Sequence, residues 1–447
     1  MFTTLKNAFK VKEIRVKLLF TLAMLVVIRL GSQLPVPGIN GAKLQEFLNP
    51  LVNAGGGAFD FFDAITGGSF TVMSIFALNI NPYITSSIII QLLTIAIPKL
   101  EELQRDGEDG RKKLTTITRY LTVGLALLQS TAMAINFANS GVISKQWYAF
   151  VVCIATLTAG SAFLMWVGEQ ITEHGVGNGI SIVLTINIIS RIPEDLKTLY
   201  DTKVAPRFSD GPATAALIIL LIIAVFIGMV VLVIILNDAV RNIPVQYSKS
   251  VRGRRQMGAA SSSIPLKVNT SGVIPIIFAQ SLLQLPIIIT SFVTKGNGSA
   301  GVWGEIQKYM NQSNWCVFKP ISELKYSVGL LVYIGLVIFF AYFYTSITFN
   351  PIMVADNLKK QGGFIPGIRP GKPTSDYLNK VLNYIVFIGA VGLIIVCVLP
   401  YIFSGVFNVS VSTTGTSLII VVSVTIETIK QVESMMLVRN YKGFLEN

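Results

Sequence analysis

Ten apolar stretches occupy most of this 447-residue sequence, and each is long enough, or nearly long enough, to cross a lipid bilayer. A transmembrane helix needs about 20 consecutive apolar residues. In lipid, only helices and closed β-barrels pair all of their backbone polar groups, and these stretches are too long for barrel strands. The sequence therefore predicts an all-α polytopic membrane protein, with ten transmembrane helices near residues 18–34, 71–97, 117–138, 147–167, 177–193, 214–237, 272–293, 327–349, 380–402 and 416–436.

The composition agrees with a membrane protein whose loops are basic. Hydrophobic residues make up 52% of the chain and charged residues only 13%, while the formal net charge is +13. A soluble domain has about 25% charged residues. Basic loops suit anionic lipid, ribosomal RNA or an acidic protein surface. For any single loop, the general bias of Lys and Arg toward the cytoplasmic side explains the positive charge equally well, without any binding partner.

The distribution of Lys and Arg predicts the orientation. Basic residues concentrate before the first apolar stretch and in the loops 98–113, 238–270 and 350–380, whereas residues 402–415 contain none. We therefore expect both termini on the cytoplasmic side. The charges that flank residues 177–193 have the opposite distribution. We keep this span because, without it, the longer basic loop 238–270 would lie on the external side.

Ten helices divide into an N-terminal half, residues 1–193, and a C-terminal half, residues 194–447. An odd number of helices in each half gives the halves opposite orientations, as in an inverted repeat. No sequence repeat supports this division. In proteins of this kind, the working site usually lies at the midplane between the halves.

The first external loop ends in an apolar, aromatic segment that does not suit an aqueous loop. Its residues are Phe59, Asp60, Phe61, Phe62, Asp63, Ala64, Ile65, Thr66, Gly67, Gly68, Ser69 and Phe70. One interpretation is an interfacial helix that is anchored by aromatic side chains. The other is a re-entrant segment that fills a cavity, since irregular backbone at membrane depth is tolerated only where it is buried or lines water.

The predicted spans are polar in places but almost uncharged. Pro82 is expected to kink the second helix, and Glu427 is the main ionisable residue within a span. An ion-coupled transporter usually keeps several ionisable groups there. No nucleophile–base pair or nucleotide-binding motif appears, and the single His and three Cys lack the spacing of metal ligands. We expect no enzyme activity, cofactor or metal, and a conduit with an aliphatic constriction fits better.

Two long basic loops on the cytoplasmic side, 238–270 and 350–379, favour docking of a partner. The first part of residues 238–270 alternates apolar and polar residues, which predicts a β-hairpin. In the second loop, Pro366 and Pro370 bracket Arg369 and restrict its backbone.

Several runs make the resemblance to a known family specific. They are Arg29 to Gly31, Pro35 to Ile39, residues 74–93, the run from Glu173 to Ile182, the run from Pro265 to Pro275, and Gly367 to Gly371. Together with the ten-span layout, they resemble SecY, the channel subunit of the bacterial protein translocase, over essentially the whole chain. One departure is Asn79, where the family usually has Gly.

The resemblance implies a clamshell of helices 1–5 and 6–10 around an hourglass pore in the bacterial plasma membrane. Unfolded secretory polypeptides with signal sequences would cross through the pore, and membrane segments would leave sideways into lipid between helices 2–3 and 7–8. The expected partners are the SecE and SecG subunits and, as sources of driving force, the SecA motor ATPase or the ribosome. The alternative function is a secondary transporter with inverted repeats.

The resemblance also implies roles for individual residues. The pore ring would be Ile84, Ile88, Leu184, Ile188, Ile277 and Ile420, and residues 59–70 would be the plug. Polar residues that could form a seam at the lateral gate are Ser87, Gln91, Gln129, Gln280 and Gln284. The surface that docks SecA or the ribosome would contain Arg254, Arg255, Lys359, Lys360 and Arg369.

Overall fold

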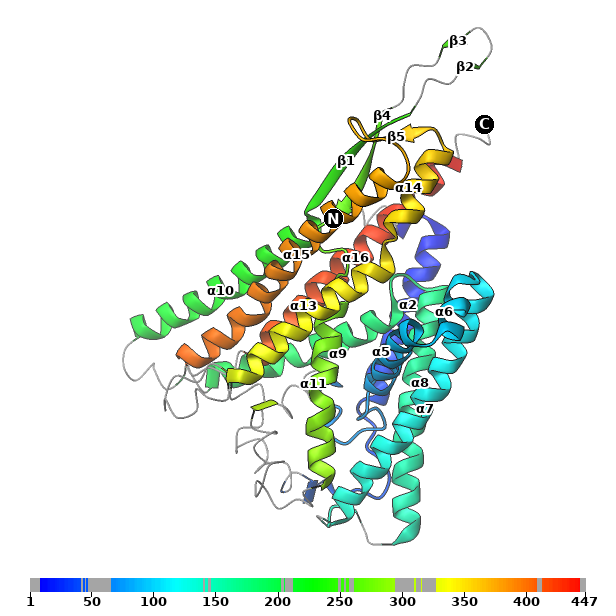
Figure 1. The fold of residues 1–447 in the computed structure, drawn as a ribbon. Helices are drawn as coiled ribbons and strands as arrows, with labels where there is room; N and C mark the ends of the chain where they lie inside the picture. The colour runs from blue at the N-terminus through cyan, green and yellow to red at the C-terminus, as the bar shows by residue number, and fades with distance from the viewer. Residues whose placement is uncertain are drawn as a thin grey trace.

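The computed structural model of the chain is a bundle of long helices with a small β-sheet projecting from one end (Figure 1). It describes residues 9–41, 43–44, 46, 66–139, 141–143, 146–201, 205, 212–247, 251–252, 255–256, 261–293, 309–310, 315, 327–407 and 412–442.

Each predicted apolar stretch contains a helix. In chain order, these helices are α2 (Lys12–Gly31), α5 (Asn81–Ala96), α7 (Glu108–Asn139), α8 (Trp147–His174), α9 (Gly179–Leu199), α10 (Pro212–Asp238), α11 (Ile274–Val293), α13 (Val328–Thr348), α15 (Lys372–Phe407) and α16 (Ser412–Lys442). Two further helices are α6 (Pro98–Arg105) and α14 (Pro351–Lys360). Hydropathy and length thus located the helices correctly.

The number of crossings stays a prediction. Of the described residues, five helical segments are by themselves long and apolar enough to span a membrane: Glu108–Ala138, Trp147–His174, Ile219–Asp238, Val328–Lys360 and Lys372–Ile402. The pair α5 and α6, which is bent by 107°, would make a sixth. A helical protein with several apolar helices is therefore established, while ten crossings and the side of each terminus are not.

The second apolar stretch differs from the prediction. Residues 71–80 form successive turns, and α5 begins only at Asn81 with Pro82 in its first turn. The predicted kink at Pro82 is therefore wrong. Proline in the first turn removes no intrahelical hydrogen bond, so it starts the helix instead of bending it. Met73 and Asn79 have φ angles of 50° and 52°, which a right-handed helix does not contain.

The helices pack as two groups that meet in the middle of the bundle. α7 lies against α5 and α8, and α2 and α9 lie against α8. In the second group, α13 packs on α11 and α15, and α16 packs on α10 and α15. The groups touch where α9 meets α16 and where α5 meets α11, and Figure 1 shows α9 and α11 between the blue-to-cyan and the yellow-to-red helices.

The predicted β-hairpin is present, and it joins the two long basic loops. Strand β1 (Val240–Tyr247) pairs antiparallel with β4 (Ser261–Lys267), and the short strands β2 (Val251–Arg252) and β3 (Arg255–Gln256) continue the hairpin. Strand β5 (Gly363–Phe364), from the second loop, pairs with the other edge of β1. The alternating residues Ile243 and Val245 are buried against α14 and α15. The sheet and these two helices therefore pack as one unit.

Candidate functional site

The six residues of the predicted ring lie in one hydrophobic cluster, although they come from four helices. α5 contributes Ile84 and Ile88, α9 contributes Leu184 and Ile188, and α11 and α16 contribute Ile277 and Ile420. All are buried except Ile277, which is half-buried and packs against the others. Other aliphatic residues, such as Val183 and Ile419, belong to the same cluster. Burial alone therefore does not single out the six, and their assignment to a ring stays a prediction from their register in the motifs.

A tight connection between α8 and α9 sets the position of Leu184 and Ile188. The side chain of Asn178 caps α9 by accepting hydrogen bonds from the amides of Ile180 and Ser181, at 3.1 and 3.4 Å. Gly179 lies so close to α8 that a Cβ atom added to it would be 1.9 Å from the carbonyl oxygen of Gly168. The amide of Gly179 also donates to Thr172 Oγ1 on α8, at 2.9 Å. The glycine-rich run after Glu173 is thus a close helix-to-helix turn.

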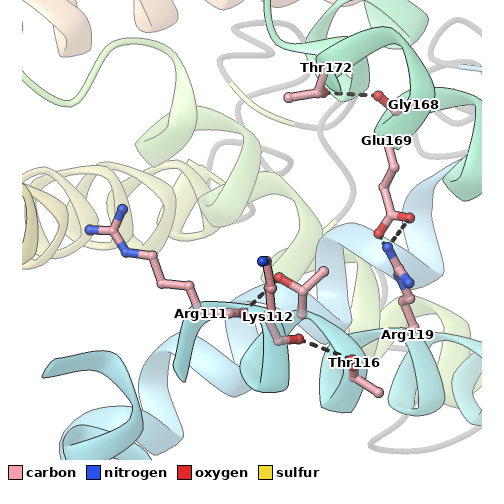
Figure 2. A network of polar contacts seen from close by, with 8 residues as sticks. Arg111, Lys112, Thr116, Arg119, Gly168, Glu169 and Thr172 are labelled. Atoms are coloured by element: carbon pink, nitrogen blue, oxygen red, sulfur yellow. Dashed lines mark hydrogen bonds and ion pairs between the residues drawn. The ribbon is translucent and has the colours of Figure 1, made fainter. Parts of the chain in front are cut away.

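An ion pair fastens α7 to α8 near the same end of α8 (Figure 2). Arg119 donates from Nε to Glu169 Oε1 at 2.9 Å, and its Nη2 lies 2.8 Å from Glu169 Oε2. Figure 2 shows the two side chains meeting between these helices, with Gly168 directly before Glu169 and Thr172 one turn further along α8. This geometry is bidentate, which is the favourable form of an Arg–carboxylate pair. Because the Arg119 side chain is 46% exposed, its contribution to stability is modest.

Only the end of the predicted plug, Thr66 to Phe70, is described; residues 59–65 lie outside the described part of the chain. Thr66, Ser69 and Phe70 are buried. The carbonyl of Gly67 accepts a 3.4 Å hydrogen bond from Arg29 Nη1 on α2. Gly67 also lies against the backbone oxygen of Asn187, the residue that precedes Ile188. This end of the segment therefore contacts α9 beside the ring, whereas Phe70 packs into a separate cluster with Met73 and Leu78.

The five residues of the predicted gate seam are on helices that adjoin one another. Among their described side chains, only Ser87 and Gln91 share a hydrogen bond. Ser87 and Gln91 are on α5, Gln129 is on α7, and Gln280 is buried on α11, which packs against α5. Gln91 Nε2 donates to Ser87 Oγ at 3.4 Å within α5. In the described part of the chain, Gln91 Oε1 and Gln280 Nε2 are buried without a hydrogen-bond partner. The side chain of Gln284 is outside the described set.

Three of the predicted docking residues, Lys359, Lys360 and Arg369, are exposed. Lys359 and Lys360 form the last turn of α14, and Arg369 is exposed between two turns. Ile365 is buried and Ile368 half-buried in the core beneath this loop, and the carbonyl of Arg369 accepts a 2.8 Å bond from Thr374 Oγ1. Packing and this hydrogen bond support the loop backbone beside Arg369, while its restriction by the flanking prolines stays a prediction. Arg255 is on β3, while Arg254 and the side chain of Arg255 lie outside the described set.

Sequence reasoning missed a polar bridge at the root of the hairpin. Asn237, at the end of α10, donates from Nδ2 to Ser423 Oγ on α16 at 2.8 Å. Its Oδ1 accepts from Asn269 Nδ2, also at 2.8 Å, where the chain leaves β4 for α11. These hydrogen bonds connect the two chain segments that enter and leave the hairpin with α16, the helix that carries Ile420. Single Asn residues in a sequence give no signal of such a pairing.

The described residues contain no group of three His, Cys, Asp or Glu side chains that could hold a metal ion. Cys153 and Cys397 are separately buried.

Comparison with known proteins identifies the family. The SecY family model matches residues 74–429. Protein translocase subunit SecY of Streptomyces coelicolor is 41% identical over 458 residues, and that of Bacillus subtilis is 42% identical over 457 residues; both matches cover 100% of each chain.

Solved structures share the fold. One is described as a protein conducting channel, with a TM-score of 0.63 at 17% identity, covering 94% of this chain and 92% of the other. Another is a SecY channel whose plug domain is described as stabilising the closed state, with a TM-score of 0.65 at 16% identity and the same coverage. A third is Sec61 in a canine ribosome–channel complex, with a TM-score of 0.58 at 16% identity, covering 94% and 92%. The chain belongs to the SecY family.

Proposed function

We propose that this chain is the protein-conducting channel subunit of a bacterial translocase. Unfolded secretory polypeptides cross the plasma membrane through it, and transmembrane segments leave it sideways into lipid. The observation that carries the proposal is the meeting of six aliphatic side chains, from both halves of the chain, in one buried cluster. Full-length relatives named as translocase subunits support the same function. The chain itself conducts and does not catalyse.

The ring acts as a soft seal. Its side chains offer no hydrogen bonds to a passing polypeptide, so they close around it without holding it. A narrow aliphatic constriction also loses its water and thereby blocks ions. In the resting channel, Ile84 and Ile88 on α5 would face Leu184 and Ile188 on α9, with Ile277 and Ile420 completing the ring from the other half.

The plug and the lateral gate complete the resting seal. Residues 59–70 would cap the ring from the external side, with the hinge at Gly67 and Gly68, whose φ angles are 67° and 81°. The gate would open between α5 and α7 on one side and α11 and α13 on the other. Its amides, including Gln91 and Gln280, pack less firmly than an all-apolar surface, so an apolar signal helix could separate them.

Partners bind at the end that carries the sheet. The planar guanidinium of Arg369 suits both the phosphates of ribosomal RNA and carboxylates on the SecA motor. We assign the same surface to Arg254, Arg255, Lys359 and Lys360. SecE would hold the two halves together and SecG would lie beside them. With ten crossings, both termini would be cytoplasmic.

The ring is tested by cysteine crosslinking to a stalled translocating polypeptide. Cysteine at Ile84, Leu184 or Ile420 should crosslink to the polypeptide. Ile189 provides the matched control, because it follows Ile188 on α9 but is 41% exposed and points away from the cluster. Crosslinks at Ile189 that equal those at Leu184 would refute the ring, and crosslinks confined to other helices would refute the pore itself.

A further inference from the structure

Asn79 occupies a position that would suit glycine better. It lies two residues before α5, its φ angle is 52°, and its exposed fraction is 0%. Asn adopts this left-handed conformation more readily than most residues, but with more strain than Gly. A buried polar side chain at such a position is favourable only when it forms a hydrogen bond.

That hydrogen bond is with Asn187 on α9. Asn187 Nδ2 donates to Asn79 Oδ1 at 3.2 Å, and Asn187 is itself only 3% exposed. The backbone carbonyl of Asn79 accepts a second bond, from Ser161 Oγ on α8, at 3.0 Å. Asn79 therefore connects the start of α5 with two other helices through its side chain and its main chain separately.

The pair lies beside the ring on α9 and just before the start of α5, the other helix that carries ring residues. On α9, Asn187 is adjacent to Ile188 and three residues after Leu184, so it is on the neighbouring part of the same face. At the start of α5, Ile80 directly follows Asn79 in the chain. The carbonyl oxygen of Ile80 accepts a 3.0 Å hydrogen bond from the amide of the ring residue Ile84. Sliding α5 along α9 would separate the two amides in a region of low dielectric, where an unpaired amide is costly.

We propose that Asn79 and Asn187 form a positioning pair, which keeps the ring residues of α5 level with those of α9 in the resting channel. The proposal deepens the proposed function and rests on it, because the ring must be the seal for its level to matter. Aliphatic side chains alone do not fix this register, because their contacts are non-directional. The amide pair supplies the direction that they lack.

The test uses the complete channel complex, reconstituted in lipid vesicles, and measures ion leak in the absence of a translocating polypeptide. Asn79→Gly removes the side-chain bond while relieving the backbone strain at φ 52°, and Asn187→Ala removes the other partner. Each variant should increase the resting leak about threefold, the effect expected from an average interhelical hydrogen bond within a membrane. The double variant should leak no more than either single variant, since all three lack the same bond.

Ser130→Ala is the matched control. Ser130 is buried and shares a 3.0 Å hydrogen bond with Thr158, which joins α7 to α8 away from the ring. It should leave the leak unchanged. Thermal unfolding separates positioning from general support: Asn79→Gly should leak while it unfolds at or above the wild-type temperature.

Three results would overturn the proposal. They are a wild-type leak in both single variants, an additive leak in the double variant, and an equal leak in Ser130→Ala. The crosslinking test of the ring is independent of these. Positive crosslinks together with an unchanged leak would reject the amide pair and keep the pore, whereas absent crosslinks would reject the pore.

Discussion

Gly179→Ala should destabilise the channel through the contact between α8 and α9. The added Cβ would lie 1.9 Å from the Gly168 carbonyl oxygen and 2.9 Å from Ile171 Cβ. Real Cβ atoms do not approach closer than 3.0 Å, so the two backbones must separate by roughly 3.0 − 1.9 = 1.1 Å. A backbone oxygen cannot move aside as the end of a side chain can. We expect a loss of about 1–3 kcal/mol, the usual cost of overpacking.

Gly335→Ala on α13 is the control with the opposite expected sign. A Cβ atom at Gly335 would meet no other atom within 4 Å. Alanine in a helix interior is more favourable than glycine by about 0.5–1 kcal/mol, so this variant should be as stable as the wild type or more stable. The measurement is thermal unfolding of the purified complex, together with the amount of protein in the membrane. Equal or greater stability of Gly179→Ala than of wild type would refute the reasoning about this contact.

Three further outcomes are expected from the proposed function. Deleting residues 60–68 should increase ion leak through the resting channel, and an unchanged leak would favour the interfacial-helix interpretation of that segment. Replacing Gln91 and Gln280 with Leu should change the hydrophobicity that a signal sequence needs for export, measured with a series of graded signals; an unchanged threshold counts against the polar seam. Arg369→Glu should abolish motor-driven translocation in vesicles while the protein remains inserted, whereas Lys359→Glu should have a smaller effect because a single flexible exposed charge contributes little; full transport by Arg369→Glu would contradict its docking role.

The sequence predicted the helices because hydropathy decides where a chain can lie in a membrane. It failed at residues 71–80, which are as apolar as a span but form turns. The reason is backbone conformation: Met73 and Asn79 have positive φ angles, and no hydropathy pattern encodes these. The departure from glycine at Asn79 was visible in the sequence, but its partner on α9, 108 residues away, was not.

The two long basic loops show the same limit. Alternation predicted the pairing of β1 with β4, since the period of two is a local signal. The addition of β5 to the other edge of β1 was not predicted, because a strand of two residues carries no pattern. The prolines around Arg369 predict a restricted backbone from local sequence, whereas the packing of buried Ile365 and half-buried Ile368 beneath the loop depends on residues far apart in the chain.

The kinds of contact within and between the proposed halves differ in a way that suits a clamshell. Directional bonds join helices of the same half: Arg119 with Glu169 and Asn79 with Asn187 in the N-terminal half, and Asn237 with Ser423 in the C-terminal half. Among the described residues, the halves meet through α9 with α16 and α5 with α11, where the shared cluster is aliphatic and aromatic and the amides of Gln91 and Gln280 are the polar exceptions.

This difference determines what opening would cost. Non-directional apolar contacts weaken gradually as surfaces slide or separate, and a translocating apolar segment can replace them with similar contacts of its own. A buried amide pair such as Asn79 with Asn187 has no such substitute, because breaking it leaves a polar group without a partner. Parting the halves therefore disturbs mainly contacts that the passing polypeptide can restore, while the bonds that shape each half stay intact.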